Sequence, residues 1–237
     1  MLGKASRDSE IRRFPSAPVS LGAVIVPNRV VLAPMSGITD APFRRLVERL
    51  GAGLVVSEMT ACAGLVRGER EASVRSEGRG VDIHVVQLAG CEAQWMSEGA
   101  RIAEAQGADI IDINMGCPSK QVTNGAGGSA LMRDLDHALS LIEATMSAVR
   151  VPVTLKMRLG WDTSSINAPE LAVRAEAAGI KLITVHGRTR VSFSMGPPTG
   201  MPSAPSSKLS QFQSSSMAIF APAKMLNARS SFRGRMP

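Results

Sequence analysis

Short apolar, β-branched runs alternate with segments of helical periodicity between residues 30 and 187. This alternation is typical of repeated βα units around a parallel sheet. The intervening segments carry apolar residues at helical spacing, and three of the four end in glycine before the next run. We therefore expect six strands, at residues 30–34, 54–58, 84–89, 108–114, 152–158 and 182–187, and four helices, within residues 41–53, 92–109, 134–149 and 168–180.

Polar residues gather at the carboxyl ends of the expected strands. In a (β/α)₈ barrel each strand delivers side chains at that end to one mouth, which holds the active site. Period-two alternation predicts that Asp112 and Asn114 point into the barrel while Ile111 faces the helices. It also places Lys156 and Arg158 on the inward face. The whole set is Glu58, Gln87, Asp112, Asn114, Lys156, Arg158 and His186.

The expected fold is α/β, a barrel of the TIM (β/α)₈ type with only about six βα units recognisable. A doubly wound open sheet is the alternative. It would have a glycine-rich turn after its first strand, and the segment APMSGITD does not contain GxGxxG. We expect residues 1–18 to be an N-terminal extension and residues 19–190 to form the partial barrel domain.

The composition changes abruptly after residue 190. Residues 191–237 contain 11 Ser, 6 Pro and 5 of the 27 Lys and Arg, but none of the 20 carboxylates, and show no rhythm of strand and helix. We expect an irregular, basic, Ser/Pro-rich tail. A shift of reading frame near codon 191 would explain why the tail begins where a seventh strand is due. Because most of the net charge of +7 lies in this tail, it is weak evidence for a nucleic-acid partner.

Several classes of protein are disfavoured by the rest of the chain. No apolar run approaches the roughly 18 to 20 residues of a membrane helix, and the charged beginning lacks the apolar centre of a signal peptide. A cytoplasmic location is therefore expected. Three cysteines, Cys62, Cys91 and Cys117, have no CxxC spacing, so we expect neither a disulfide framework nor a metal site.

The strongest local signal is the segment 112–132, DINMGCPSKQVTNGAGGSALM, which runs from the fourth expected strand into a glycine-rich loop. Its glycines, from Gly125 to Gly128, permit close approach of a ligand, but the GK[ST] ending of a phosphate-binding loop is missing. A lone cysteine is more often a small buried residue than a catalyst. Cys117, however, lies just past a strand end, before a rigid proline and close to Asn114, which favours a catalytic thiol.

Five motifs of the chain occur in the same order and at similar separations in bacterial tRNA-dihydrouridine synthases. They are NRVVLAPMSGITDAPFR, VVQLAG, DINMGCPSK, LKMRLGW and HGRTR. Over residues 19–190 the chain resembles this family, particularly the branch of the B type and the nitrogen-regulation homologue. The resemblance implies a TIM-barrel flavoprotein that binds FMN and tRNA. Such an enzyme reduces uridine in tRNA to 5,6-dihydrouridine, with NADPH first reducing FMN.

The resemblance also implies roles for individual residues. Cys117 would give a proton to C5 of the uracil, which suits a thiol that is mostly protonated at neutral pH. Lys156 would stabilise the reduced flavin, because its charge lies near the pyrimidine ring of the cofactor. The residues that bind FMN would be Pro34, Met35, Ser36, Gln87, Lys156 and His186, and those that bind the substrate would be Asn114 and Arg158.

Plainer interpretations of these residues stay open. Lys156 would equally suit an ion pair with Asp112 or Glu58, and Gln87 would suit a satisfied core amide. The charged loop over residues 64–80, and the basic residues Lys120, Arg188 and Arg190, fit an ordinary solvated surface.

The function also has alternatives. The chain could be another FMN barrel reductase that acts on free pyrimidines, or a catalytically dead RNA-binding or regulatory fragment. Relatives continue past HGRTR with a seventh and an eighth strand, and six strands do not close a barrel. We therefore expect impaired activity, weak FMN binding, and open edges on the first and sixth strands.

Overall fold

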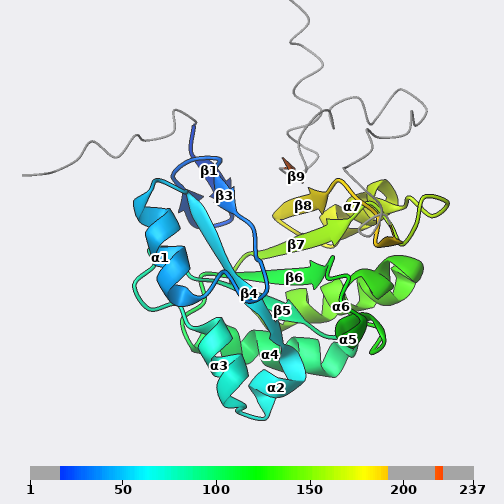
Figure 1. Ribbon diagram of the computed structural model, residues 1–237, viewed down its shortest axis with the longest axis horizontal. Helices are drawn as coiled ribbons and strands as arrows, with labels where there is room; N and C mark the ends of the chain where they lie inside the picture. Colours follow the sequence, from blue (N-terminus) through cyan, green and yellow to red (C-terminus); the bar gives the residue numbers. More distant parts are fainter. Residues whose placement is uncertain (1–16, 192–216, 221–237) are drawn as a thin grey trace, which may run out of the picture.

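The computed structural model describes residues 17–191 and the backbone of residues 217–220 (Figure 1). Six parallel strands follow one another in sequence order across one curved sheet. They are β3 (Val31–Leu32), β4 (Leu54–Ala61), β5 (Val85–Ala89), β6 (Ile110–Met115), β7 (Val153–Arg158) and β8 (Leu182–His186). A doubly wound sheet reverses its strand order at a switch point, and this sheet does not. The predicted α/β fold, part of a (β/α)₈-type barrel, is confirmed.

The four helices predicted from periodicity are present on the outer side of the sheet (Figure 1). In three of them the chain leaves the helix through a glycine with positive φ, namely Gly51, Gly107 and Gly179. At the other end of the first helix the Asp40 carboxylate caps the backbone N–H of Phe43 at 2.9 Å. The helices are α1 (Ala41–Arg49), α4 (Ala93–Ala105), α6 (Leu135–Ala148) and α7 (Ala168–Ala177).

The main apolar core lies between the outer face of the sheet and these helices. Ile111 and Ile113 of β6 pack in it, together with Leu141 of α6 and Leu171 of α7. Asp112 lies on the opposite, inward face, so the predicted alternation of β6 is confirmed.

A hairpin that the sequence did not predict closes the amino ends of the strands. It consists of β1 (Val19–Leu21) and β2 (Val24–Val26), which pair antiparallel. Leu21 and Val26 are buried in a second apolar cluster with the first residues of the barrel strands. Because these apolar side chains fill the inside of the sheet at the amino ends of the strands, the polar inward side chains lie at the carboxyl ends. The other buried members of the second cluster are Leu54, Val56, Val85, Ile110 and Leu182.

The charged stretch over residues 64–80, expected as a loop, is largely helical. It contains the end of α2 (Cys62–Val66) and all of α3 (Arg70–Ser76). Leu65 and Ala72 are buried in the main core. The prediction was wrong because the stretch contributes only Leu65 and Ala72 to the apolar core, too few to show a period. The remaining short elements are α5 (Lys120–Thr123) and the 3₁₀ helix η1 (Gly128–Arg133).

A short part of the expected irregular tail forms a strand. Strand β9 (Met217–Phe220) pairs antiparallel with β8, so the edge of the sixth barrel strand is not open. Since barrel strands of this fold are parallel, β9 is not a seventh βα unit. The rest of the expected tail (192–216 and 221–237) and residues 1–16 of the expected extension lie outside the described residues. In the described part of the chain, no helix is long and apolar enough to cross a membrane.

Candidate active site

A continuous polar network crosses the inside of the sheet towards the carboxyl ends of β5, β6 and β7. Gln87 Nε2 donates to Asp112 Oδ2 at 2.6 Å, and Thr154 Oγ1 donates to Asp112 Oδ1 at 2.6 Å. Asn114 Nδ2 donates to Gln87 Oε1 at 2.8 Å. The parallel register, which sets Gln87 beside Asp112 and Asp112 beside Thr154, brings these side chains together. The network fixes the amide of Gln87 in one orientation, because its two ends meet a carboxylate and a donor.

Burial controls the charges in this network. Asp112 is only 5% exposed, and burial raises the pKa of its carboxyl above the ordinary value, against the hydrogen bonds from Thr154 and Gln87. Burial likewise lowers the pKa of Lys156, while Asp112 raises it. Each shift favours the neutral form of its group, and their mutual attraction opposes both shifts.

The loop that carries Cys117 is held by its neighbours on three sides. Asn114 Oδ1 accepts the backbone N–H groups of Gly116 at 3.1 Å and of Cys117 at 2.9 Å. Arg158 Nε donates to the Gly116 carbonyl at 2.7 Å, and Ser129 Oγ donates to the Cys117 carbonyl at 2.8 Å. The cysteine itself is half-buried. These contacts hold the backbone of Cys117 in one position at the carboxyl end of β6.

One glycine of the glycine-rich segment, Gly128, lies against the protein backbone. A Cβ at Gly128 would lie 2.8 Å from the Cys117 carbonyl oxygen, and the residue has φ +58°. At Gly128 the close approach is therefore to the backbone of the cysteine loop. The role predicted for Gly125 and Gly127, close approach of a ligand, stays a prediction.

Lys156 and His186 complete the inward face of β7 and β8. Among the described residues Lys156 makes no ion pair or side-chain hydrogen bond, so the alternative role for it, an ion pair with Asp112 or Glu58, is not formed. Burial, with the charges of Arg158, Lys156 and Arg188, lowers the pKa of His186 to about 4. His186 is therefore neutral at neutral pH. The mouth keeps positive charge on arginine, since burial lowers the pKa of Arg158 only to about 10.

The loop between β3 and α1 brings Pro34, Met35 and Ser36 to the same end of the sheet. The Glu58 carboxylate accepts the N–H of Gly37 at 2.7 Å, which ties this loop to β4. Met35 is 38% exposed. Its side chain is accessible, whereas Gln87 is only 1% exposed beneath the network.

The structure thus joins Cys117, Asn114, Gln87 and Arg158 through hydrogen bonds, and register sets Lys156 beside Asn114 and His186 beside Arg158. Pro34, Met35 and Ser36 come from a separate loop. Sequence reasoning missed Thr154 and Ser129, which look like ordinary strand and loop residues. Their signal is the pairing between strands, which a single sequence does not display. No group of three or more metal-ligating side chains occurs among the described residues.

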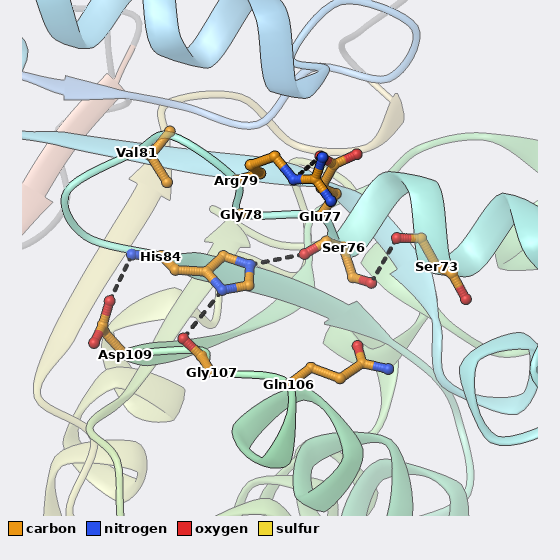
Figure 2. Close-up of a pocket in the computed structure, with 10 residues that line it drawn as sticks. All are labelled: Ser73, Ser76, Glu77, Gly78, Arg79, Val81, His84, Gln106, Gly107 and Asp109. Atoms are coloured by element: carbon orange, nitrogen blue, oxygen red, sulfur yellow. Dashed lines mark hydrogen bonds and ion pairs between the residues drawn. The ribbon is translucent and has the colours of Figure 1, made fainter.

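A hollow of about 550 Å³ lies at the opposite end of the sheet, beside the amino ends of β5 and β6. Figure 2 shows the His84 imidazole between the carbonyls of Ser76 and Gly107, with ring nitrogens 2.7 and 3.2 Å from these oxygens. The N–H of His84 donates to the Asp109 carboxylate at 2.8 Å. His84 therefore ties the end of α3 to the turn before β6. The hollow is remote from the cysteine loop.

Comparison with known proteins gives a consistent result. Residues 31–201 match the family described as Dihydrouridine synthase (Dus). The chain is 65% identical over 171 residues to a probable tRNA-dihydrouridine synthase of Rhizobium leguminosarum bv. phaseoli, covering 72% of this chain and 54% of that protein. It is 48% identical over 179 residues to tRNA-dihydrouridine synthase B of Pseudomonas putida, covering 75% and 53%.

The chain spans about half the length of the curated relatives it matches. Among solved structures, histamine dehydrogenase from Rhizobium sp. 4-9 aligns with a TM-score of 0.42 and 16% identity. That alignment covers 60% of this chain and 33% of the other.

Proposed function

The chain belongs to the dihydrouridine synthase family, and from that premise we propose that it carries the catalytic face of an enzyme that reduces uridine in tRNA to 5,6-dihydrouridine. FMN is the proposed cofactor, NADPH the proposed reductant, and tRNA the proposed partner. The observation that supports this most directly is the cysteine loop, held beside an inward lysine at the carboxyl ends of β6 and β7. The expected cytoplasmic location stays a prediction that follows from the tRNA substrate.

The donor set at the mouth fits the ring of a flavin. Lys156 is a cation without an ion-pair partner among the described residues, and burial lowers its pKa, so an anionic group beside it would be strongly favoured. Pro34, Met35 and Ser36 would lie along the ring from the exposed loop after β3. When bound, FMN supplies the hydride chemistry that side chains lack. Its phosphate is typically held by the loops after strands seven and eight, which are not among the described residues.

Cys117 is the proposed proton donor to C5 of the uracil. Its carbonyl and its N–H are both engaged, so the side chain is the only group of this residue that remains for substrate. Asn114 holds the N–H of Cys117, and this contact makes it a positioning residue as well as a proposed substrate contact. Arg158 is only 3% exposed and has the same double assignment, because its Nε holds Gly116.

Gln87 is proposed to contact the flavin only through the side-chain N–H that the polar network does not use. One amide N–H donates to Asp112 and the oxygen accepts from Asn114, so a second N–H remains for a ligand. His186, neutral because its pKa is lowered, would either accept or donate one hydrogen bond to flavin or substrate. Because this chain holds no described seat for the phosphate, we propose that its activity is impaired.

The test is uridine reduction by the purified chain supplied with FMN, NADPH and an unmodified tRNA transcript. Cys117→Ala and Cys117→Ser should abolish dihydrouridine formation, measured by mass spectrometry of the digested tRNA, and should leave flavin binding unchanged. Cys91→Ser is the matched control, since Cys91 is another half-buried thiol, in the loop after β5. Free uracil in place of tRNA tests the alternative substrate.

Two results would count against the proposal. Equal turnover of Cys117→Ala and the unmodified chain would remove Cys117 as the proton donor. Reduction of uracil in preference to tRNA would assign the chain to reductases of free pyrimidines.

A further inference from the structure

Two arginines lie over one tryptophan at the rim of the mouth. The guanidinium carbon Cζ of Arg133 is 5.0 Å from the centroid of the Trp161 ring, and Cζ of Arg190 is 4.9 Å from it. These are cation–π distances. Three segments meet here, the end of η1, the loop after β7 and the segment after β8. Arg133, Trp161 and Arg190 are called the rim cluster below.

The rim cluster is attached to the candidate active site by backbone contacts. The N–H of Arg190 donates to the Gly160 carbonyl at 3.1 Å, and Arg158 Nη1 donates to the neighbouring Thr189 carbonyl at 3.0 Å. Arg158 in turn holds the cysteine loop. A molecule bound at the rim cluster would therefore lie next to the entrance to Cys117.

The two cations of the cluster have no ion-pair partner within the described chain. Neither Arg133 nor Arg190 forms an ion pair or a side-chain hydrogen bond with a described residue. The neighbouring carboxylates are already engaged. Asp134 caps α6 by accepting the N–H of His137 at 3.0 Å, and Asp162 accepts the hydroxyls of the two serines at positions 164 and 165 at 2.7 and 2.8 Å.

Arginines on the helices behave differently. Arg75 is paired with Glu71, and Arg174 is paired with Asp136, both at 2.5 Å. Both of these arginines have a carboxylate partner on a helix, whereas the two arginines of the rim cluster share a tryptophan ring in place of a carboxylate.

A stacked guanidinium uses its face for the ring and keeps its edge of N–H donors for another group. That edge matches phosphate in a two-pronged contact. Since both Cζ atoms lie within 5.0 Å of one centroid, the two cations are within about 10 Å of each other. They repel at this separation, and a chain of phosphates relieves the repulsion. The ring already carries guanidinium groups, which disfavours Trp161 as a platform for a base.

We propose that the rim cluster binds the sugar–phosphate backbone of RNA beside the nucleotide that enters the mouth. This rests on the proposed function, which makes tRNA the substrate, and it adds an RNA contact at Arg133, Trp161 and Arg190. The phosphate of a nucleotide cofactor has the same chemistry. Arg133 is exposed and Arg190 is half-exposed, so the cluster suits a polymer that passes over the surface more than a cofactor enclosed in the barrel.

The experiment measures binding of a fluorescein-labelled tRNA transcript to the full chain by anisotropy, over a series of KCl concentrations. Arg133→Ala/Arg190→Ala should weaken binding at least about tenfold at low salt and make the slope of log K against log [KCl] less negative by about 1 to 2, because roughly one to two phosphate contacts are lost. Arg49→Ala/Arg150→Ala removes the same charge from two exposed residues near the amino ends of the strands and should change affinity less than about threefold.

Further variants separate charge from geometry. Arg133→Lys/Arg190→Lys keeps the charge but not the planar fork, and should give intermediate affinity. Trp161→Leu keeps an apolar side chain but removes the ring, so it should weaken binding by a smaller factor than the double alanine variant. Circular dichroism of each variant should match the unmodified chain.

Four results would overturn the proposal: no measurable tRNA binding by the unmodified chain, unchanged affinity and salt slope in the double alanine variant, equal displacement of tRNA by poly-glutamate of the same charge, or loss of FMN binding in that variant with intact tRNA affinity. Its failure is separable from that of the proposed function. An inactive chain whose tRNA affinity depends on the two arginines refutes only the proposed function, whereas an active chain whose affinity does not depend on them refutes only the rim contact.

Discussion

Removal of the Asn114 side chain should release the cysteine loop. Its Oδ1 accepts two backbone N–H groups, those of Gly116 and Cys117, at 3.1 and 2.9 Å, and its Nδ2 donates to Gln87. A hydrogen bond contributes about 1 kcal/mol net, and a donor left without a partner in a buried place costs about 1–3 kcal/mol. Asn114→Ala should therefore lower the free energy of loop opening by about 2 kcal/mol, which makes exchange of the two amide protons roughly thirtyfold faster.

The assay is hydrogen exchange with mass spectrometry on peptides that cover residues 112–120. Asn124→Ala is the matched control, because Asn124 is exposed at the end of α5. Asn114→Asp separates the two functions of the side chain. The aspartate keeps one oxygen that accepts the two N–H groups, but its second oxygen lies against Gln87 Oε1, where Asn114 has a donor. The Gln87 amide cannot rotate to offer its NH₂ group, because Nε2 already donates to Asp112. That variant should keep loop protection and lose global stability. Exchange in Asn114→Ala within twofold of the unmodified chain would refute the role of Asn114 in holding Cys117.

Three further predictions concern the cofactor and the charge of the mouth. Lys156→Ala should weaken flavin binding or slow flavin reduction by NADPH, since a charge pair at about 4 Å and an effective dielectric near 20 amounts to roughly 4 kcal/mol before desolvation is subtracted. Lys181→Ala, just before β8, is the control. Normal flavin content with normal reduction would contradict the prediction. The pKa of His186 is lowered to about 4 from an ordinary 6.5, so between these pH values the unfolded chain binds more protons than the folded chain. The contribution of His186 to the free energy of unfolding is therefore complete above pH 6.5 and is lost as the pH falls towards 4. His186→Gln should flatten that dependence in denaturation at pH 4.5 and 7, while the opposing contribution of the raised Asp112 pKa is common to both proteins; parallel curves would show that His186 does not titrate as described. Finally, riboflavin and FMN should bind this chain with affinities within about threefold of each other if no phosphate seat is present, and FMN binding ten times more tightly would show that one exists.

The strands and their faces were predictable from the sequence because side chains alternate with a strict period of two. Asp112 and Ile111 could be assigned to opposite faces from their positions alone, and the structure agrees. The contacts within the inward face were not predictable. Gln87 meets Asp112, and Asp112 meets Thr154, through a register between strands separated by 25 and 42 residues of chain. The alternation of side chains shows which face of the sheet a residue lies on. Only the register shows which residue of the next strand it contacts.

The cysteine loop shows a similar limit. Its sequence marks it as unusual, but the reason for Gly128 becomes apparent only when the Cys117 carbonyl is found against it. The hairpin at residues 19–26 was missed because each of its strands has three residues, fewer than periodicity needs. Its role, to fill the amino end of the barrel, depends on residues from four different strands of the sheet.

The described sheet separates two parts of cofactor recognition that an intact barrel combines. Every residue proposed to act on the ring or on the uracil lies on β3 to β8 or in the loops that follow them. The phosphate of a barrel cofactor is typically held after strands seven and eight, and the strand paired with β8 here runs antiparallel to it, unlike a seventh barrel strand. That the tail is read out of frame stays a prediction. Whether or not it is, Cys117, Lys156 and the rim cluster are positioned by β6, β7, β8, η1 and the loops that follow these elements. The described residues therefore hold the proposed contacts to the flavin ring and the uracil, whereas a seat for the phosphate is not among them.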